Sequence, residues 1–220
     1  MLEFPLKLLL SYLLGSVVGS LVLGRWRGVD IRRLGSGNAG STNALRTQGI
    51  GFAMVVMLID VAKGWLAVSV IAKFAWGWPG ATLVGASGWL SAACATAAML
   101  GHVYPVFDAF RGGKGAAVLL GCLLGMAPYT LLAIVSAWLI TAMLLGFVSV
   151  ATITAAWVLP FLLMATRPMP TASLLWFGVF AALFITLTHH GNIARLRAGT
   201  EPRAKALWLL GRGKLHGRGK

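Results

Sequence analysis

Long apolar stretches alternate along the chain with three polar segments. The polar segments cover residues 25–46, 102–114 and 189–220. About 20 consecutive apolar residues are enough to cross the ~30 Å hydrocarbon core of a bilayer as one helix. Residues 6–24 have about this length, and Glu3 with Lys7 near their start argues against a cleaved signal peptide. The pattern therefore predicts a series of membrane-spanning helices that begins with a retained first helix.

The basic residues give the expected topology, because Lys and Arg collect in cytoplasmic loops. Fifteen of the 19 Lys and Arg residues lie in the three polar segments. If all three segments are cytoplasmic, the chain crosses the membrane an even number of times between successive segments. Two spans fit between the first and second segments, near residues 50–72 and 82–101, with a break at residues 76–80.

Residues 115–188, between the second and third polar segments, are far too long for two spans and fit four of about 18 residues each. Pro and Gly mark the expected breaks at Ala127-Pro128, Leu145-Gly146 and Arg167-Pro168. We therefore predict an all-α integral membrane protein with seven transmembrane helices, its N-terminus outside and its C-terminus in the cytoplasm. The seven-helix domain covers residues 1–202, and a basic cytoplasmic tail covers residues 203–220.

The composition agrees with a membrane protein and excludes an ordinary soluble domain. Of all residues, 58% are hydrophobic and 11% are charged, and the mean hydropathy is +0.83. A net charge of +14 could indicate nucleic-acid binding. The basic residues, however, lie between apolar segments and in the last segment and do not form one polar domain, so no nucleic-acid partner is expected. Cys94 and Cys122 lie within apolar segments without a metal-ligand spacing, so we expect buried thiols, no disulfide and no metal site.

The first polar segment contains a run rich in glycine and small polar residues, Gly35-Ser36-Gly37-Asn38-Ala39-Gly40-Ser41-Thr42-Asn43. Glycines permit positive φ and let successive N–H groups point at one anion, while Ser, Thr and Asn add neutral donors. Arg46, expected at the start of the second membrane helix, suits a phosphate because its guanidinium can bind in a bidentate manner. These residues predict an anion-binding loop, with a flexible loop of ordinary composition as the alternative.

The second polar segment leads into Gly112-Gly113-Lys114-Gly115 at the expected start of an apolar helix. Backbone N–H groups at a helix N-terminus, together with a lysine, can bind an anion. The spacing of a Walker motif is absent, so no nucleotide is inferred. The alternative for Lys114 is a lysine that reaches the membrane surface. For His102 we favour a capping or interfacial role over catalysis.

The third polar segment begins with His189-His190-Gly191-Asn192. His189 and Asn192 are three residues apart and would share one face of a helix, so both can point at a site formed with the other polar segments. A purely structural histidine is the alternative.

Two further patterns lie inside the predicted spans. Asp60 and Lys63 are one turn apart within the second span, and we favour a structural ion pair over a role in the mechanism. Gly15 and Gly19 have the spacing of a close contact with a neighbouring helix.

Three motifs in order resemble those of the PlsY family of bacterial glycerol-3-phosphate acyltransferases. They are Gly-Ser-Gly-Asn-x-Gly-x-Thr-Asn-x-x-Arg at 35–46, His-x-x-Pro-x-Phe-x-x-Phe-x-Gly-Gly-Lys-Gly at 102–115 and His-x-x-Asn-Ile-x-Arg-Leu-x-x-Gly-x-Glu at 189–201. An Asp-x-x-Lys-Gly element at Asp60, Lys63 and Gly64 also resembles the family. The resemblance implies a seven-helix enzyme of the bacterial inner membrane with its active site facing the cytoplasm.

The resemblance also implies transfer of a fatty acyl group from acyl-phosphate to the 1-hydroxyl of sn-glycerol 3-phosphate, giving lysophosphatidic acid for phospholipid synthesis. Composition and spacing do not identify these substrates. No cofactor is expected; the lipid bilayer is a partner, and the enzyme that produces the acyl-phosphate is a candidate partner. The implied catalytic residues are Ser36, Lys114 and His189. The implied substrate-binding and loop-shaping residues are Gly35, Gly37, Asn38, Thr42, Asn43, Arg46, Gly112, Gly113 and Asn192.

Several alternatives stay open at this point. Either His189 or a substrate phosphate oxygen can accept the hydroxyl proton. A transporter of organic phosphates would also combine a helix bundle with an anion site, although transporter sites usually lie near the bilayer midplane. A non-catalytic membrane scaffold is a third possibility, but it would not explain the Gly, Asn and Lys residues of the three polar segments. The basic tail, which departs from the family pattern, either lies on the anionic leaflet or is disordered.

Overall fold

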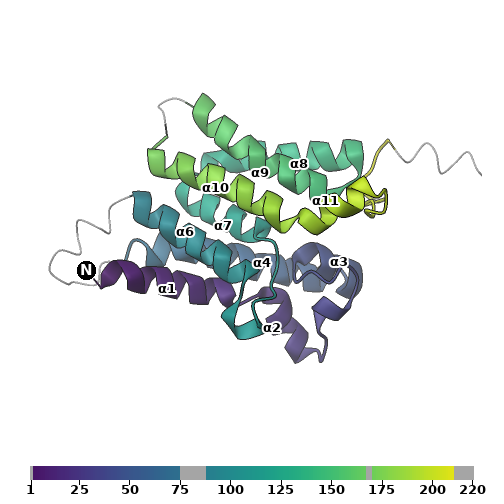
Figure 1. The fold of residues 1–220 in the computed structure, drawn as a ribbon, viewed down its shortest axis with the longest axis horizontal. Helices are drawn as coiled ribbons and strands as arrows, with labels where there is room; N and C mark the ends of the chain where they lie inside the picture. The colour runs from purple at the N-terminus through teal and green to yellow at the C-terminus, as the bar shows by residue number, and fades with distance from the viewer. Residues whose placement is uncertain (1, 75–87, 167–169, 211–220) are drawn as a thin grey trace, which may run out of the picture. The chain divides into compact units, whose positions relative to one another are not determined.

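All the regular secondary structure described by the computed structural model is helical (Figure 1). The described residues are 2–74, 88–166 and 170–210. This architecture confirms the predicted all-α class. The chain forms two compact units: unit 1 comprises Met1–Pro128 with Thr171–Phe177, and unit 2 comprises Tyr129–Pro170 with Gly178–Lys220.

The helices of the first part of the chain are α1 (Glu3–Ser16), α2 (Gly19–Trp26), the 3-10 turn η1 (Ile31–Arg33), α3 (Ser41–Gln48), α4 (Ile50–Leu66), the π-helical η2 (Ala67–Ile71), α6 (Gly88–Val103), the 3-10 turn η3 (Val106–Asp108) and α7 (Ala116–Met126). The second part contains the 3-10 turn η4 (Pro128–Thr130), α8 (Leu131–Leu145), α9 (Val148–Ala165), α10 (Ala172–Thr188) and α11 (His190–Arg197).

Four described helical stretches are long and apolar enough to cross a membrane: Ile50–Ile71, Gly88–Asp108, Pro128–Leu145 and Val148–Ala165. Two helix pairs pass the same test only together and are bent, α1 with α2 by 47° and α10 with α11 by 55°, and α7 is a shorter apolar helix. By length and composition the described residues thus supply four to six spans, whereas the sequence predicts seven.

The expected breaks at Ala127-Pro128 and Leu145-Gly146 coincide with helix ends. The expected breaks at Arg167-Pro168 and at residues 76–80 both lie outside the described residues.

In unit 1, α1 and α6 run parallel and approach closely at glycines. Leu8 packs against Leu90 and Cys94, and further along both helices Gly15 lies against Ala98. A Cβ atom on Gly15 would collide with the α6 backbone, and one on Gly101 would collide with the α1 backbone. Lipid tails provide no hydrophobic force between helices, so such close backbone packing stabilises the pair. The expected helix contact at Gly15 is confirmed.

The helices α4 and α7 also run parallel and also meet at reciprocal glycines. A Cβ atom on Gly64 of α4 would collide with the backbone of α7, and one on Gly121 of α7 would collide with the backbone of α4. The order of the contacts, Gly121 beside Val61 and Gly125 beside Ser69, gives the parallel direction. Both glycine positions therefore exclude any larger side chain.

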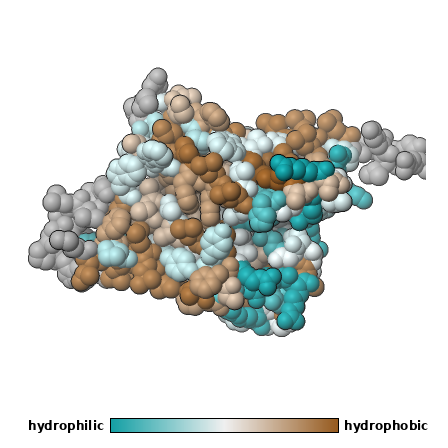
Figure 2. Space-filling model, viewed as in Figure 1, coloured by the Kyte–Doolittle hydropathy of each residue, from teal (hydrophilic) through white to brown (hydrophobic). Residues whose placement is uncertain are grey.

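The two parallel pairs run in opposite directions, because α1 and α2 are antiparallel to α4. The second expected glycine contact is also confirmed: Gly19 lies against Val56 and Ile59 of α4, while the preceding turn lies beside Lys63. As a result, the loop after α2 and the loop between α6 and α7 lie at the same end of unit 1 (Figure 1). Hydrophilic residues gather at this polar end in the space-filling view (Figure 2).

Large apolar side chains are exposed along the helices of both units, as expected for surfaces that face lipid. Examples are Leu58, Leu132, Phe161, Trp176 and Leu187. Cys94 and Cys122 are fully buried, which confirms the expected packing role of the two thiols.

A buried lysine holds the break between α1 and α2. The Lys63 Nζ atom donates to the carbonyl oxygens of Gly15 and Val17, at 2.9 and 2.8 Å, which the break leaves without helical partners. It also lies 2.9 Å from an Asp60 carboxylate oxygen, which accepts from the N–H of Gly19 at 3.3 Å. Both charged side chains are buried. The predicted ion pair is confirmed, and its partner atoms show that it fixes the helix break.

In unit 2, the first residues of the basic tail pack against the turn between α8 and α9. The Ala204 N–H donates to Gly146 O, and the Leu209 N–H donates to Met143 O. The Arg203 guanidinium lies over the rings of Phe147 and Trp208. Residues 203–209 of the tail therefore contact the rest of unit 2, and residues 211–220 lie outside the described residues.

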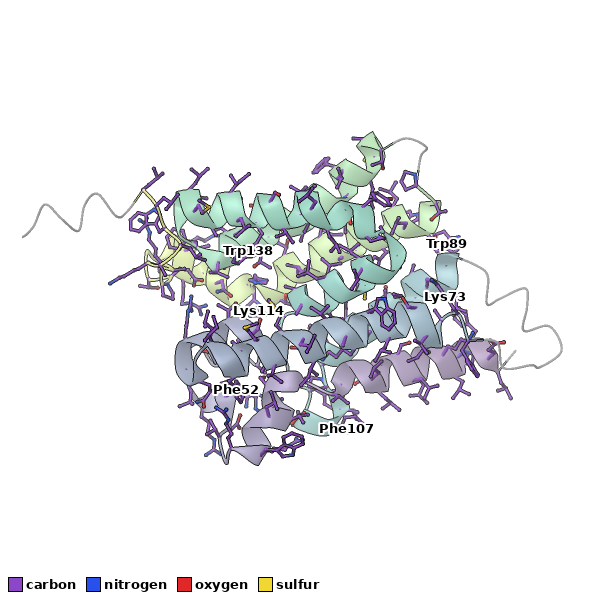
Figure 3. The ribbon with its side chains drawn as sticks, turned by 180° about the vertical axis from the view of Figure 1, so that it is seen from behind. Phe52, Lys73, Trp89, Phe107, Lys114 and Trp138 are labelled. Carbon is purple, nitrogen blue, oxygen red and sulfur yellow. The ribbon has the colours of Figure 1, made fainter. Side chains whose placement is uncertain are left out.

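We expect Lys63→Met and Asp60→Asn each to destabilise the folded protein by about 3–5 kcal/mol, because each leaves a buried charge without its partner. The double variant should lose less than the sum of the two. Thermal unfolding in detergent measures the effect, with Lys73→Met as a control because Lys73 is exposed (labelled in Figure 3). Unchanged stability in both single variants would contradict the structural role, and unchanged stability with loss of all activity would assign the pair to the mechanism.

Candidate functional site

The glycine-rich loop of the first polar segment is built around the side chain of Asn43. Its Oδ1 atom accepts from the Ser36 N–H at 2.9 Å, and its Nδ2 atom donates to Ile31 O and Leu34 O at 3.1 and 2.9 Å. The side chain is buried, and both amide hydrogens are used within the loop. Asn43 therefore shapes the loop and has no N–H left to donate to a phosphate.

Two of the three glycines in this loop take the left-handed backbone conformation. Gly35 and Gly37 have φ of 56° and 73°, on either side of the exposed Ser36. Gly40 differs from the expectation, since its φ is −108° and it caps the N-terminus of α3. Asn38 is half-buried beside Gly40. The loop thus turns sharply at Ser36 and then extends into α3.

The position of Arg46 differs from the sequence prediction. We expected it at the start of the second membrane helix, but it lies in the last turn of the separate short helix α3, which ends at Gly49 with φ of 83°. Thr42 and Arg46 are four residues apart on α3 and share one face, and Arg46 is exposed. Arg46 therefore extends from a helix that follows the glycine loop directly.

The loop of the second polar segment is attached to the end of α6. The N–H groups of Gly112 and Gly113 donate to Val103 O and His102 O, at 3.1 and 3.0 Å. Gly115 then takes φ of 90° and caps α7, which begins at Ala116 as expected. Lys114 is half-buried and precedes this cap directly (Figure 3).

His102, for which we predicted a capping or interfacial role, is buried in the last turn of α6. It is 2% exposed, and its Nδ1 atom lies 2.8 Å from Lys63 Nζ and 3.5 Å from Asp60 Oδ1. The backbone carbonyls at the end of α6 bind the glycine loop, while the His102 side chain points to the buried ion pair. The side chain therefore joins the buried ion pair to the second polar segment.

Charged residues that the sequence analysis did not select connect the two loops. The Arg32 Nη1 atom donates to Asp108 O at 3.0 Å, and Arg25 forms an ion pair with the buried Asp108 side chain. Asp30 binds Arg32 through both carboxylate oxygens. The hydrogen bond from Arg32 holds the pKa of Asp30 below its ordinary value, and the same pair raises the pKa of Arg32. The only sequence signal for this network was the presence of charges near the glycines.

A cavity of about 280 Å³ lies beside this charge network. Its lining residues are Leu21, Arg25, Gly28, Val29, Asp30, Arg32 and Asp108. The carboxylates of Asp30 and Asp108 both pair with arginines in its wall.

In unit 2, His189 lies at the bend between α10 and α11 and is buried. It precedes α11, whereas the sequence prediction placed it on one helical face with Asn192. Its Nδ1 atom lies 2.7 Å from Ile185 O. Because a carbonyl oxygen only accepts, Nδ1 carries the hydrogen, and in the neutral ring Nε2 has a lone pair.

Asn192 lies in the first turn of α11 and donates to Glu201 Oε1 at 2.7 Å. Glu201 also accepts from Ser149 and Arg195, both at 2.8 Å. Burial raises the pKa of the Glu201 carboxyl, but the hydrogen bonds from Asn192, Ser149 and Arg195 outweigh burial and hold this pKa below its ordinary value. Glu201 is therefore ionised, and its carboxylate holds the Asn192 side chain in place. The sequence motif contains Glu201, but it was not among the predicted site residues.

The predicted site residues thus fall into two groups. The residues of the first and second polar segments lie at the polar end of unit 1, where Arg32 and Asp108 join their loops. His189 and Asn192 belong to unit 2.

The chain is similar to known proteins over nearly its whole length. A family model described as glycerol-3-phosphate acyltransferase matches residues 6–199. The glycerol-3-phosphate acyltransferase of Synechococcus elongatus is 40% identical over 197 residues, which cover 89% of this chain and 91% of the relative. That of Agrobacterium fabrum is 39% identical over 199 residues, which cover 90% of each chain.

Two crystal structures of PlsY (YgiH), an integral membrane glycerol 3-phosphate acyltransferase, are similar to this fold. The glycerol 3-phosphate form has a TM-score of 0.80 at 32% identity, with 91% of this chain and 94% of the other covered. The lysophosphatidic acid form has a TM-score of 0.80 at 30% identity, with 93% and 97% covered. The resemblance of the three motifs is confirmed, and the chain belongs to the glycerol-3-phosphate acyltransferase family.

Proposed function

We propose that this protein transfers a fatty acyl group from acyl-phosphate to the 1-hydroxyl of sn-glycerol 3-phosphate. The hydroxyl oxygen attacks the acyl carbonyl carbon, the bond from that carbon to the phosphate oxygen breaks, and inorganic phosphate leaves. The product is lysophosphatidic acid. Membership of the family and the similarity to the two PlsY forms support this substrate and this product.

The observation that carries the proposal is the joining of two glycine-containing loops at the polar end of unit 1. We assign the exposed Ser36 side chain to donate to the oxyanion that forms on the attacked carbonyl. The N–H groups of Ser36 and Gly37 are already bound within the loop, to Asn43 Oδ1 and Leu34 O. Lys114 at the start of α7 and Arg46 on α3 supply positive charge for the substrate phosphates. Thr42, Asn38 and the loop glycines complete the substrate-binding set.

We assign His189 as the general base. Its Nδ1–H group is bound to Ile185 O, so in the neutral ring Nε2 is the atom that accepts the hydroxyl proton. Asn192, held by Glu201, is assigned to substrate binding. A phosphate oxygen of the substrate is the alternative acceptor of the proton.

A transporter of organic phosphates is the weaker assignment. Transporter sites lie near the middle of the membrane, between repeats. Here the glycine loops lie at one end of unit 1, and the buried Asp60–Lys63 pair binds the backbone of a helix break. An enzyme that takes its acyl donor at the membrane surface fits this arrangement better.

We further propose that all seven spans cross the bacterial inner membrane, with the N-terminus outside and the site facing the cytoplasm. The opposite directions of the two parallel helix pairs support this topology, since they put the first and second polar segments at one end. The enzyme that produces the acyl-phosphate is the proposed partner, because its product must reach this membrane.

The topology predicts which single cysteines react with a membrane-impermeant thiol reagent. In a background without the buried Cys94 and Cys122, Arg111→Cys and Ala198→Cys should react only from the cytoplasmic side. Leu2→Cys should react from the outside. All three of these residues are exposed. Reaction of positions 111 and 198 from opposite sides would exclude a single cytoplasmic site.

The donor is tested with purified protein in lipid vesicles that contain labelled glycerol 3-phosphate. We expect lysophosphatidic acid with acyl-phosphate and much less with acyl-CoA, because the small polar loops fit a phosphate group. Equal rates with acyl-CoA would contradict the donor assignment, and no product with either donor would contradict the enzyme assignment.

Lys114→Met should lower kcat/KM by one to two orders of magnitude, because a charged hydrogen bond contributes about 1.5–3 kcal/mol. Lys114→Arg should restore little activity, since a planar guanidinium differs in shape from a compact ammonium. Lys73→Met is the matched control, with an exposed lysine outside the site. Nearly normal kinetics of Lys114→Met would remove this residue from the site.

A further inference from the structure

The imidazole of His102 has one edge against a buried cation. Its Nδ1 atom is 2.8 Å from Lys63 Nζ, and Lys63 also donates to two carbonyl oxygens of the break between α1 and α2. The same amine also lies 2.9 Å from Asp60 Oδ1, and Asp60 Oδ1 lies 3.5 Å from His102 Nδ1. These contacts on one edge of the imidazole hold the orientation of the ring.

The opposite edge of the same ring lies against the glycine loop. A Cβ atom on Gly113 would collide with Nε2 of His102 and would lie 2.8 Å from its Cε1. The Gly113 N–H is bound to the backbone oxygen of His102 at 3.0 Å. The loop can thus approach α6 only as far as the ring permits.

Gly112 makes a different contact. A Cβ atom there would collide with the backbone oxygen of His102, and the Gly112 N–H binds Val103 O at 3.1 Å. The two adjacent glycines are therefore limited by different parts of α6, one by a side chain and the other by the main chain. This difference separates the effect of the ring from that of the helix backbone.

We propose that His102 is a positioning residue, whose Lys63-oriented ring sets the position of the Gly112–Gly113–Lys114 loop and hence of the Lys114 amine. The proposal rests on the proposed function, because the role of Lys114 does. His102 touches no substrate in this scheme and acts through Gly113. The buried ion pair, the helix break and the loop that carries Lys114 then form one continuous set of contacts.

The test is suppression of a glycine variant by a smaller side chain at position 102. Gly113→Ala should raise KM for the phosphate-bearing substrates and lower kcat/KM by about tenfold or more, because its methyl group displaces the loop. His102→Asn keeps an acceptor near the position of Nδ1 for Lys63 and removes the edge that faces Gly113. The double variant should therefore return to within about threefold of His102→Asn alone.

Gly112→Ala is the matched control, one residue away. Its methyl group meets a backbone oxygen, so His102→Asn should not restore it. A histidine that only fills the core would change the unfolding temperature of the variants and leave the KM of folded enzyme unaltered. Nearly normal KM in Gly113→Ala, or equal rescue of both glycine variants, would overturn the proposal.

A second measurement keeps this test separate from the proposed function. The unfolding temperatures of the same variants in detergent should show the same selective rescue of Gly113→Ala, whatever the reaction is. If the wild-type protein forms no lysophosphatidic acid, the proposed function fails while this pattern still reports the contact. If wild-type activity is normal and KM shows no selective rescue, the positioning role is wrong even where the unfolding temperature shows the contact.

Discussion

The ammonium group of Lys63 is the interaction on which the polar end of unit 1 depends. A buried charge costs several kcal/mol unless it is paired and hydrogen-bonded. Lys63 meets this requirement only when the end of α1, Asp60 of α4 and His102 of α6 surround it together. One cation thereby fixes the break that directs α2 toward the first loop, and it orients the side chain against which the second loop lies.

Backbone contacts at glycines determine which ends of the helices meet. The reciprocal pairs Gly15 with Gly101 and Gly64 with Gly121 allow α1 to approach α6 and α4 to approach α7 more closely than any larger residue would permit. The contacts of Gly19 and Lys63 between α1–α2 and α4 then set these two parallel pairs in opposite directions. Two polar loops that are far apart in sequence are thus brought to one end, where Arg32 joins them by donating to Asp108 O.

The candidate site uses carboxylates mainly to hold other groups in place. Asp108 pairs with Arg25 near the glycine loops, and Glu201 accepts hydrogen bonds from Asn192, Ser149 and Arg195 in unit 2. The depressed pKa of Glu201 keeps it ionised and therefore acceptor-only. Asp108 and Glu201 are thus both paired with arginines, and Lys114 and Arg46 are the cations that we propose for the substrate phosphates.

The all-α class, the helix breaks at Pro128 and Gly146, the start of α7 and the family could be predicted from the sequence, because apolar run length, Pro and Gly act locally and the motifs are specific. The Asp60–Lys63 pair was predictable too, since i,i+3 spacing is a property of one helix. The location of Arg46 on the separate helix α3, the binding of Asn43 to its own loop and the burial of His102 against Lys63 became visible in the folded structure alone. These outcomes depend on contacts between residues far apart in the chain, and local spacing carries no information about them.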